Sequence, residues 1–199
     1  MSLPLPPVLV ITDRSQAKGP LEDIAAAVFA GGCRWLSLRE KDMPAAERLA
    51  SLRRIIAHAK DFRATVTVHD DLAAAVACGT GIHLPATGSV AEARRALGGG
   101  VLIGKSAHNA DEVARAAADG ADYVTLSPIF VSQSKPGYGP ALGLEALRAT
   151  PLPVLALGGV DAGNAAACIE AGAAGVATMG EAMRAANPRA FMADLLSRL

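Results

Sequence analysis

Short aliphatic runs and helical stretches alternate strictly along this chain, and that alternation limits the possible folds more than any other feature. The aliphatic runs are rich in Val, Ile, Leu or Thr and are flanked by Gly, Asp or Pro, as is typical of buried strands. We count eight such runs: Val8–Thr12, Trp35–Leu38, Thr65–Val68, Gly81–Leu84, Val101–Gly104, Tyr123–Leu126, Val154–Leu157 and Gly175–Thr178. Apolar residues three and four apart predict helices at Leu21–Ala30, Ala45–Ala59, Asp71–Cys78, Val90–Leu97, Ala110–Asp119, Leu144–Ala149, Asn164–Ala171 and Pro188–Leu199. The alternation indicates parallel strands joined by helical crossovers.

Eight strands in eight βα units close naturally into a (β/α)8 TIM barrel, and the 199 residues fit one such domain spanning 1–199. A weak internal repeat supports this fold. Segments ending in Gly32, Thr80, Ala121 and Ala173 each place a Gly between a helix and a strand. The competing fold is an open, doubly wound sheet, which usually carries GxGxxG after its first strand. Here the first strand ends in Ile11-Thr12-Asp13-Arg14, with no such motif.

Composition narrows the class of partner. The chain has 19 basic and 19 acidic residues, a formal net charge of zero, which argues against a nucleic-acid binder. A bound anion must therefore be held by a local cluster of charges.

The cellular setting follows from the cysteines and the amino terminus. Cys33, Cys78 and Cys168 are far apart, show no CxxC spacing and are interpreted as small buried hydrophobes in a reducing compartment. The segment Met1–Pro7 has no basic region, and no run approaches the ~18 apolar residues of a membrane span. We expect a cytoplasmic protein with no membrane partner, and a homo-oligomer is compatible with the sequence.

In a TIM barrel the chemistry lies at the carboxyl ends of the strands, so the polar residues there are the candidates. After the second strand, Arg39 and Lys41 are two apart in extended chain, so both can point to the barrel mouth and bind a phosphate or pyrophosphate. After the third strand comes His69-Asp70-Asp71. Here an aspartate either holds a hard cation such as Mg²⁺ or caps the next helix.

The fourth and fifth units add hydroxyl and imidazole groups. His83 lies in an apolar run, where a histidine is more often a satisfied core residue than a ligand. After the fifth strand, Ser106 could donate to a phosphate oxygen. His108 could do acid–base work, or His108 and Asn109 could cap the following helix.

The loop after the sixth strand, Ser127 to Pro140, is far longer than a usual βα loop, which favours a functional role. Ser132, Ser134 and Lys135 could clamp a pyrophosphate, and the Pro/Gly stretch that follows could act as a lid.

The seventh and eighth units carry glycines at the positions where TIM barrels often bind phosphate on backbone N–H groups, near a short extra helix. Gly158 and Gly159 follow the seventh strand, and Met179-Gly180 follows the eighth. Together these loops predict a site for a phosphorylated small molecule.

Several motifs, in order, carry a resemblance to a known family: Ile11-Thr12-Asp13, Ser37 to Lys41, Gly81 to Leu84, Gly120 to Val124, Pro128 to Lys135, and Leu157 to Val160. Over nearly the whole chain the sequence resembles thiamine phosphate synthase and its relative, thiazole tautomerase. In the synthases a hydroxymethylpyrimidine pyrophosphate loses pyrophosphate, and the nitrogen of thiazole phosphate captures the pyrimidine cation.

The resemblance implies a role for each candidate. Arg39, Lys41, Ser132, Ser134 and Lys135 would hold pyrophosphate, and Asp70 would hold Mg²⁺. Ser106 and His69 would contact substrate, whereas Gly158, Gly159, Met179 and Gly180 would bind the thiazole phosphate.

The sequence also departs from the synthase pattern. His69-Asp70 stands where that pattern has Asn-Asp, Gly180 replaces a Ser, and Pro85 to Gly88 lacks an acidic pair, so one expected Mg²⁺ carboxylate is absent at Gly88. The runs Leu84–Ser89 and Ile103–His108 look more like the tautomerase branch, although its catalytic His falls on Pro128. Three functions follow: the synthase first, then a tautomerase in which His69, His83 or His108 moves the proton, then a non-catalytic binder of thiazole or thiamine phosphate.

Overall fold

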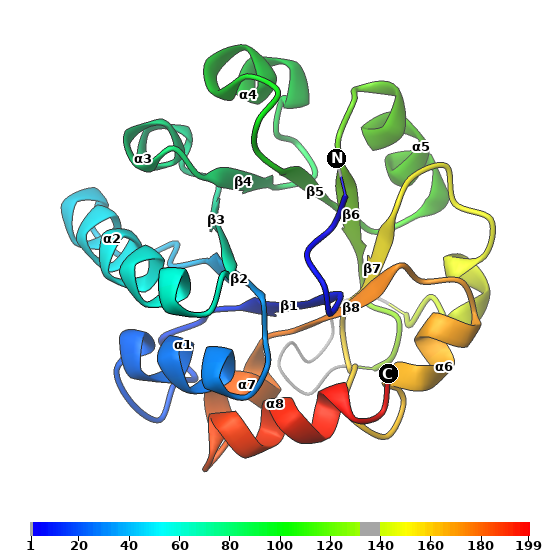
Figure 1. The fold of residues 1–199 in the computed structure, drawn as a ribbon. Helices are drawn as coiled ribbons and strands as arrows, with labels where there is room; N and C mark the ends of the chain where they lie inside the picture. The colour runs from blue at the N-terminus through cyan, green and yellow to red at the C-terminus, as the bar shows by residue number, and fades with distance from the viewer. Residues whose placement is uncertain (1, 132–139) are drawn as a thin grey trace.

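The computed structural model describes residues 2–131 and 140–199, and its eight parallel strands close into a complete barrel in the order β1 to β8. Seen along the barrel in Figure 1, the strands form a ring and the helices lie outside it. The strands are β1 (Val8–Ile11), β2 (Trp35–Leu38), β3 (Thr65–His69), β4 (Gly81–Leu84), β5 (Ile103–Ala107), β6 (Tyr123–Leu126), β7 (Val154–Ala156) and β8 (Gly175–Thr178). The pairing of β1 with β8, which sets Val8 opposite Val176, closes the ring. The predicted TIM barrel is confirmed, and the open doubly wound sheet is wrong.

Helices cover the outside of the barrel. They are α1 (Leu21–Ala30), α2 (Ala45–Asp61), α3 (Leu72–Cys78), α4 (Val90–Leu97), α5 (Ala110–Ala118), α6 (Ala165–Glu170), α7 (Gly180–Arg184) and α8 (Pro188–Leu196). None of these helices combines the length and the apolar character that a membrane crossing requires.

Local sequence explains where several helices begin. The side chains of Asp71, Ser89, Asn109 and Asn187 each accept a hydrogen bond from a backbone N–H of the first helical turn. These are the residue types that satisfy the otherwise unpaired donors at a helix start. Glycines with positive φ precede four strands, at Gly32, Gly79, Gly120 and Gly172, as the internal repeat predicted.

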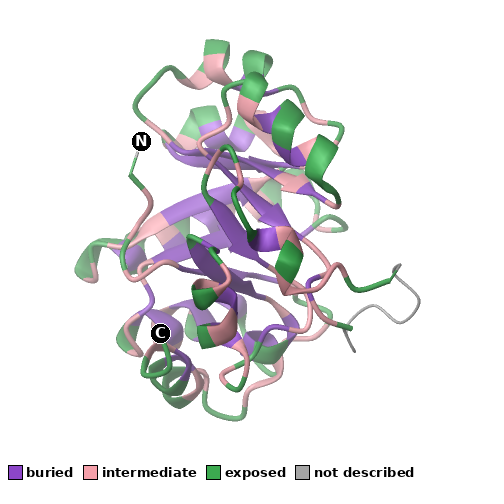
Figure 2. Cartoon of the chain, turned by 90° about the vertical axis from the view of Figure 1, so that its right-hand side faces the viewer, coloured by how far each residue is buried: buried purple, intermediate pink, exposed green. Residues whose placement is uncertain are grey.

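Two apolar layers hold the fold together. The larger layer lies between the strands and the helices, and Figure 2 shows the buried strands inside a shell of partly exposed helices. The smaller layer fills the barrel itself and comprises Leu9, Ile11, Trp35, Leu102, Tyr123, Leu155 and Ala177. Side chains along a strand alternate between the inside and the outside of the barrel. The inward-facing residues of this layer therefore show which residues nearer the carboxyl end of each strand also face inward, towards the mouth.

Two predicted elements differ from the structure. The expected helix Leu144–Ala149 is a single 3₁₀ turn, η1 (Leu144–Leu147), because Pro151 and Pro153 follow so closely that a longer helix has no room. The fifth strand is not Val101–Gly104 but Ile103–Ala107, since the preceding Gly98 to Gly100 delay the start of extended chain. Ser106 therefore lies within β5 rather than in the loop after it.

Cysteine burial agrees with the prediction at two of three positions. Cys33 and Cys168 are buried, and burial raises the pKa of each thiol to about 11. Cys78, at the end of α3, is only half-buried, because its helix leaves that face partly open to solvent.

Candidate active site

The carboxyl ends of β1 and β2 are fastened together by a buried carboxylate. Glu40, 3% exposed, accepts hydrogen bonds from the Thr12 hydroxyl at 2.6 Å and from the Arg14 backbone N–H at 3.0 Å. The Thr12 hydroxyl in turn accepts the Arg39 backbone N–H at 2.9 Å. Burial raises the pKa of Glu40, whereas the bonds from Thr12 and Arg14 oppose that rise. The network fixes the backbone at Arg39, the first candidate cation.

Arg39 reaches past the end of β1 to the loop that follows β8. Its guanidinium lies 3.9 Å from the sulfur of Met179, which directly precedes α7 after β8. Its positive charge also acts on the neighbouring Asp13 at the end of β1 and on His83 in β4. Arg39 and Met179, which are 140 positions apart in the chain, therefore meet at the carboxyl ends of the strands.

Lys41 is placed differently from the expectation. The chain turns directly after Glu40, with the Met43 N–H bonded to the Glu40 carbonyl at 3.3 Å, and Lys41 is exposed on that turn. The prediction that Arg39 and Lys41 point the same way in extended chain is wrong, because the buried Glu40 and the turn that follows it end the strand first. Lys41 remains at the rim, on the solvent side.

A second ion pair ties the β2 loop to the β3 loop. Arg48 on α2 pairs with Asp71 at 2.7 Å and donates to the carbonyls of Glu40 at 3.3 Å and Met43 at 2.8 Å. Asp71 also caps α3, accepting the Ala74 N–H at 2.9 Å. Of the two aspartates after the third strand, Asp71 is thus structural.

Asp70 is exposed at the mouth and has a positive φ of 52°, which L residues seldom adopt. Its backbone N–H is bonded to the His83 carbonyl at 3.0 Å. The second Mg²⁺ carboxylate that the resemblance implies is absent at Gly88. A side chain there would displace its neighbours, because an added Cβ would lie 2.8 Å from the Leu84 Cβ. Within residues 2–131 and 140–199, no three His, Cys, Asp or Glu side chains gather as a metal site. Mg²⁺ is nevertheless commonly held by one or two carboxylates together with substrate phosphates, and Asp70 fits that arrangement.

The floor of the mouth is polar. The His69 and His83 rings stack with their centroids 5.4 Å apart. His83 Nε2 lies 3.1 Å from the Ser106 hydroxyl and 3.3 Å from the Thr125 hydroxyl, and its Nδ1 lies 3.1 Å from the Tyr123 hydroxyl. His83 is a core residue with hydrogen-bond partners, as its apolar sequence surroundings suggested. One of these partners, Ser106, belongs to the candidate site.

His108 directly follows β5 and is held at the start of α5. Its Nδ1 is 3.0 Å from the Glu112 carboxylate one turn into α5, and its backbone N–H donates to the same carboxylate at 2.8 Å. Asn109 caps α5, so the capping interpretation is confirmed for that residue. The structure joins His108 to the start of α5.

On the side of the mouth after β7, close packing of the backbone determines which residues fit. Gly158 and Gly159 have φ values of 90° and 66°. A Cβ at Gly158 would lie 2.8 Å from the Pro128 Cα, and one at Gly159 would lie 2.7 Å from the Val131 carbonyl oxygen. Both glycines are therefore required by conformation and by space. The short helix α7 begins at Gly180, the position where TIM barrels often add an extra helix beside a phosphate.

Three predicted residues, Ser132, Ser134 and Lys135, lie outside the described residues. Others were missed by the sequence reasoning: Glu40 and Thr12 fix Arg39, and Tyr123 supports His83. Glu40 is flanked by two basic residues, so only its position shortly after an apolar strand could have signalled that it is buried.

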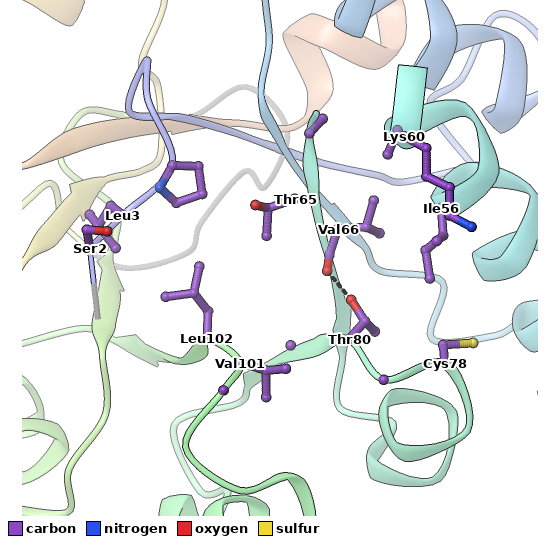
Figure 3. A pocket seen from close by; sticks show the side chains of 16 residues that line it. Ser2, Leu3, Ile56, Lys60, Thr65, Val66, Cys78, Thr80, Val101 and Leu102 are labelled. Carbon is purple, nitrogen blue, oxygen red and sulfur yellow. Dashed lines mark hydrogen bonds between the residues drawn. The ribbon is translucent and has the colours of Figure 1, made fainter. Parts of the chain in front are cut away.

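A cavity of about 550 Å³ lies at the other end of the barrel, between Ser2 to Pro4, the end of α2 and the starts of β3 and β4 (Figure 3). That end of a TIM barrel contributes to stability rather than to catalysis. We therefore place the site at the carboxyl ends, where Arg39, His83 and Ser106 meet.

Comparison with known proteins identifies similar sequences and a similar solved structure. The family model for thiamine monophosphate synthase matches residues 8–182. The chain is 39% identical over 197 residues to the thiamine-phosphate synthase of Methanoculleus marisnigri, covering 96% of this chain and 93% of that one. It is 42% identical over 177 residues to that of Anaeromyxobacter dehalogenans, covering 86% and 79%. Thiamine phosphate pyrophosphorylase from Pyrococcus furiosus superposes with a TM-score of 0.86 at 25% identity, over 96% of this chain and 94% of that one.

Proposed function

Because the chain belongs to the thiamine monophosphate synthase family, we propose that it is a thiamine phosphate synthase. This enzyme is a transferase that couples hydroxymethylpyrimidine pyrophosphate to thiazole phosphate and releases pyrophosphate. The observation that carries the proposal is the placement of Arg39, which is fastened by Thr12 and Glu40 and reaches past the end of β1 to Met179.

The chemistry requires charge stabilisation at the leaving group. The bond between the pyrimidine methylene carbon and the pyrophosphate oxygen breaks, and its electron pair leaves with the pyrophosphate. The lone pair of the thiazole nitrogen then forms the new carbon–nitrogen bond and gives a thiazolium. Arg39, Lys41 and Lys135 would neutralise the departing charge, and the hydroxyls of Ser132 and Ser134 would donate to it. Preorganised cations of this kind commonly supply the largest share of such catalysis.

Mg²⁺, when bound at Asp70, would neutralise further charge on the pyrophosphate. Since Gly88 offers no carboxylate, the cation would depend more on the substrate's own oxygens for its ligands. Gly158, Gly159, Met179 and Gly180 would present backbone N–H groups to the phosphate of the thiazole.

The tautomerase alternative receives less support. His108 is engaged by Glu112 at the start of α5, and Pro128 stands where that branch has its catalytic histidine. A binder of thiazole phosphate alone would have no use for the cation that the Glu40 network holds in place.

A single-turnover assay tests the proposal. Enzyme in excess over both substrates, with Mg²⁺, should give thiamine phosphate and pyrophosphate in equal amounts. Conversion of the thiazole tautomer alone, in the presence of a chelator, would instead support the isomerase. Tight calorimetric binding of thiazole phosphate without any turnover would support the binder.

A further inference from the structure

A buried histidine with three hydroxyl partners lies beneath the candidate pyrimidine contact, and the reaction as derived above gives it no role. His83 is 2% exposed and faces the barrel interior from β4. Tyr123 from β6 contacts its Nδ1, and Ser106 from β5 and Thr125 from β6 share its Nε2. The ring is therefore held from both sides by groups on other strands.

The sequence makes room for this arrangement. Gly104 lies directly opposite Tyr123 in the β5–β6 pairing, and a Cβ there would lie 2.1 Å from the Tyr123 ring. Trp35 packs against the same ring in a T-shaped arrangement, with 4.6 Å between the centroids. The phenol is thus locked in the orientation that presents its hydroxyl to His83.

The imidazole stays neutral. The ring is buried, and the three side chains that contact its nitrogens are hydroxyls rather than carboxylates, so none of these contacts would stabilise a charged ring. Burial also raises the pKa of Tyr123, so the phenol keeps its proton. A neutral imidazole has one donor nitrogen and one acceptor nitrogen, and its neighbours determine which is which.

We propose that His83 is a positioning residue whose Nε2–H tautomer directs the Ser106 hydroxyl at the substrate. The Tyr123 hydroxyl donates to Nδ1, so the ring proton sits on Nε2 and donates to the Ser106 oxygen. The Ser106 proton is then turned to the mouth, where it donates to an acceptor nitrogen of the pyrimidine. This inference rests on the proposed function, because it assigns the pyrimidine as the group that Ser106 contacts.

The arrangement suits the chemistry. Departure of pyrophosphate leaves positive charge on the pyrimidine, and a second cation beside Arg39 at the floor would repel it. An uncharged imidazole can orient a hydrogen-bond donor without adding that charge.

A double-mutant cycle tests the proposal, because residues that act through one another are not additive. His83→Gln and Ser106→Ala should each lower kcat/KM for the pyrimidine pyrophosphate about tenfold, the value of one well-placed hydrogen bond. The KM for thiazole phosphate should stay unchanged. The double variant should be no worse than Ser106→Ala alone, whereas losses that multiply to about a hundredfold would overturn the proposal.

Two further variants keep the test sharp if His83→Gln fails to fold. Tyr123→Phe removes only the hydroxyl and should lower the same parameter about threefold, but only where Ser106 is present. Thr125→Val is the matched control, since it removes the longer 3.3 Å contact to the same nitrogen and should have a smaller effect. Equal losses in Tyr123→Phe with and without Ser106 would contradict the proposal.

The tautomer can be read directly by ¹⁵N NMR of labelled wild-type protein. A protonated Nε2 and an unprotonated Nδ1 at neutral pH are expected, and the opposite tautomer would overturn the assignment. This measurement needs no turnover. Failure of wild-type protein to form thiamine phosphate would therefore refute the proposed function without deciding the tautomer.

Discussion

The two sides of the barrel mouth are built by different means. After β1 to β3, charged side chains hold one another: Glu40 bonds Thr12 and Arg14, and Arg48 pairs with Asp71. After β7, the backbone of Gly158 and Gly159 fits against Pro128 to Val131 with no space for a side chain. The first side can fix a cation such as Arg39, whereas the second can bring N–H groups close to an anion. We infer that each side serves one of the two substrates.

The largest expected effect is the loss of the cation from the first side. Arg39→Ala should lower turnover by about 10³-fold, because it removes the guanidinium that stabilises the departing pyrophosphate. Steady-state kinetics with both substrates measure this effect. Arg95→Ala, on the outer face of α4, removes the same charge from the chain and should change turnover little. A similar loss in both variants would mean that overall charge, rather than placement, matters.

The next effect belongs to the second side. Gly159→Ala forces an L side chain to a φ of 66° and within 2.7 Å of a carbonyl oxygen. We expect a loss of about 3 kcal/mol in the free energy of unfolding, measured by denaturant titration. The KM for thiazole phosphate should rise more than that for the pyrimidine substrate. Gly99→Ala is the control, since nothing lies within 4 Å of a Cβ there.

A smaller effect is expected from the ion pair that supports the first side. Arg48→Met keeps the aliphatic stem but leaves Asp71 and two carbonyls without their donor, which should cost about 2 kcal/mol of stability. The matched variant Arg54→Met breaks a more exposed pair with Glu22 and should cost about 0.5 kcal/mol. Equal costs would show that Arg48 does not fasten the loops.

The smallest effect concerns the floor between the two sides. His83 has a folded-state pKa of about 3 against an ordinary value of 6.5, so between these values the unfolded chain binds a proton that the folded protein does not. Stability must therefore fall as the pH is lowered through this window. From pH 6 to pH 5, wild-type protein should lose about 1 kcal/mol more than His83→Gln. Denaturant titrations at both pH values measure the difference, and parallel losses would contradict the burial of a neutral imidazole.

The sequence predicted the barrel because the strand and helix periods repeat eight times, and each period is a local property. It placed Arg39 and the glycines at the mouth for the same reason, since strand order determines which loops share an end. It did not predict the turn at Lys41, because that turn depends on Glu40 being buried against Thr12, a contact between distant residues.

Choices between equivalent polar residues also required the structure. Asp70 and Asp71 are adjacent and chemically identical, and only the contacts of Asp71 with Arg48 and the Ala74 N–H separate their roles. Ser106 was placed one element too late, because three glycines before β5 shift the start of the strand. The polar floor around His83 escaped the sequence reading, because its members come from four strands, β3 to β6, that meet only when the barrel closes.

Calorimetric titration of the two anions tests the division of the mouth most directly. Pyrophosphate with Mg²⁺ and thiazole phosphate should each bind wild-type protein. Arg39→Ala should bind pyrophosphate at least tenfold more weakly, by about 1.4 kcal/mol or more, while thiazole phosphate affinity stays unchanged. Pyrophosphate binding that is unaffected in Arg39→Ala, or an equal loss for both anions, would contradict the account.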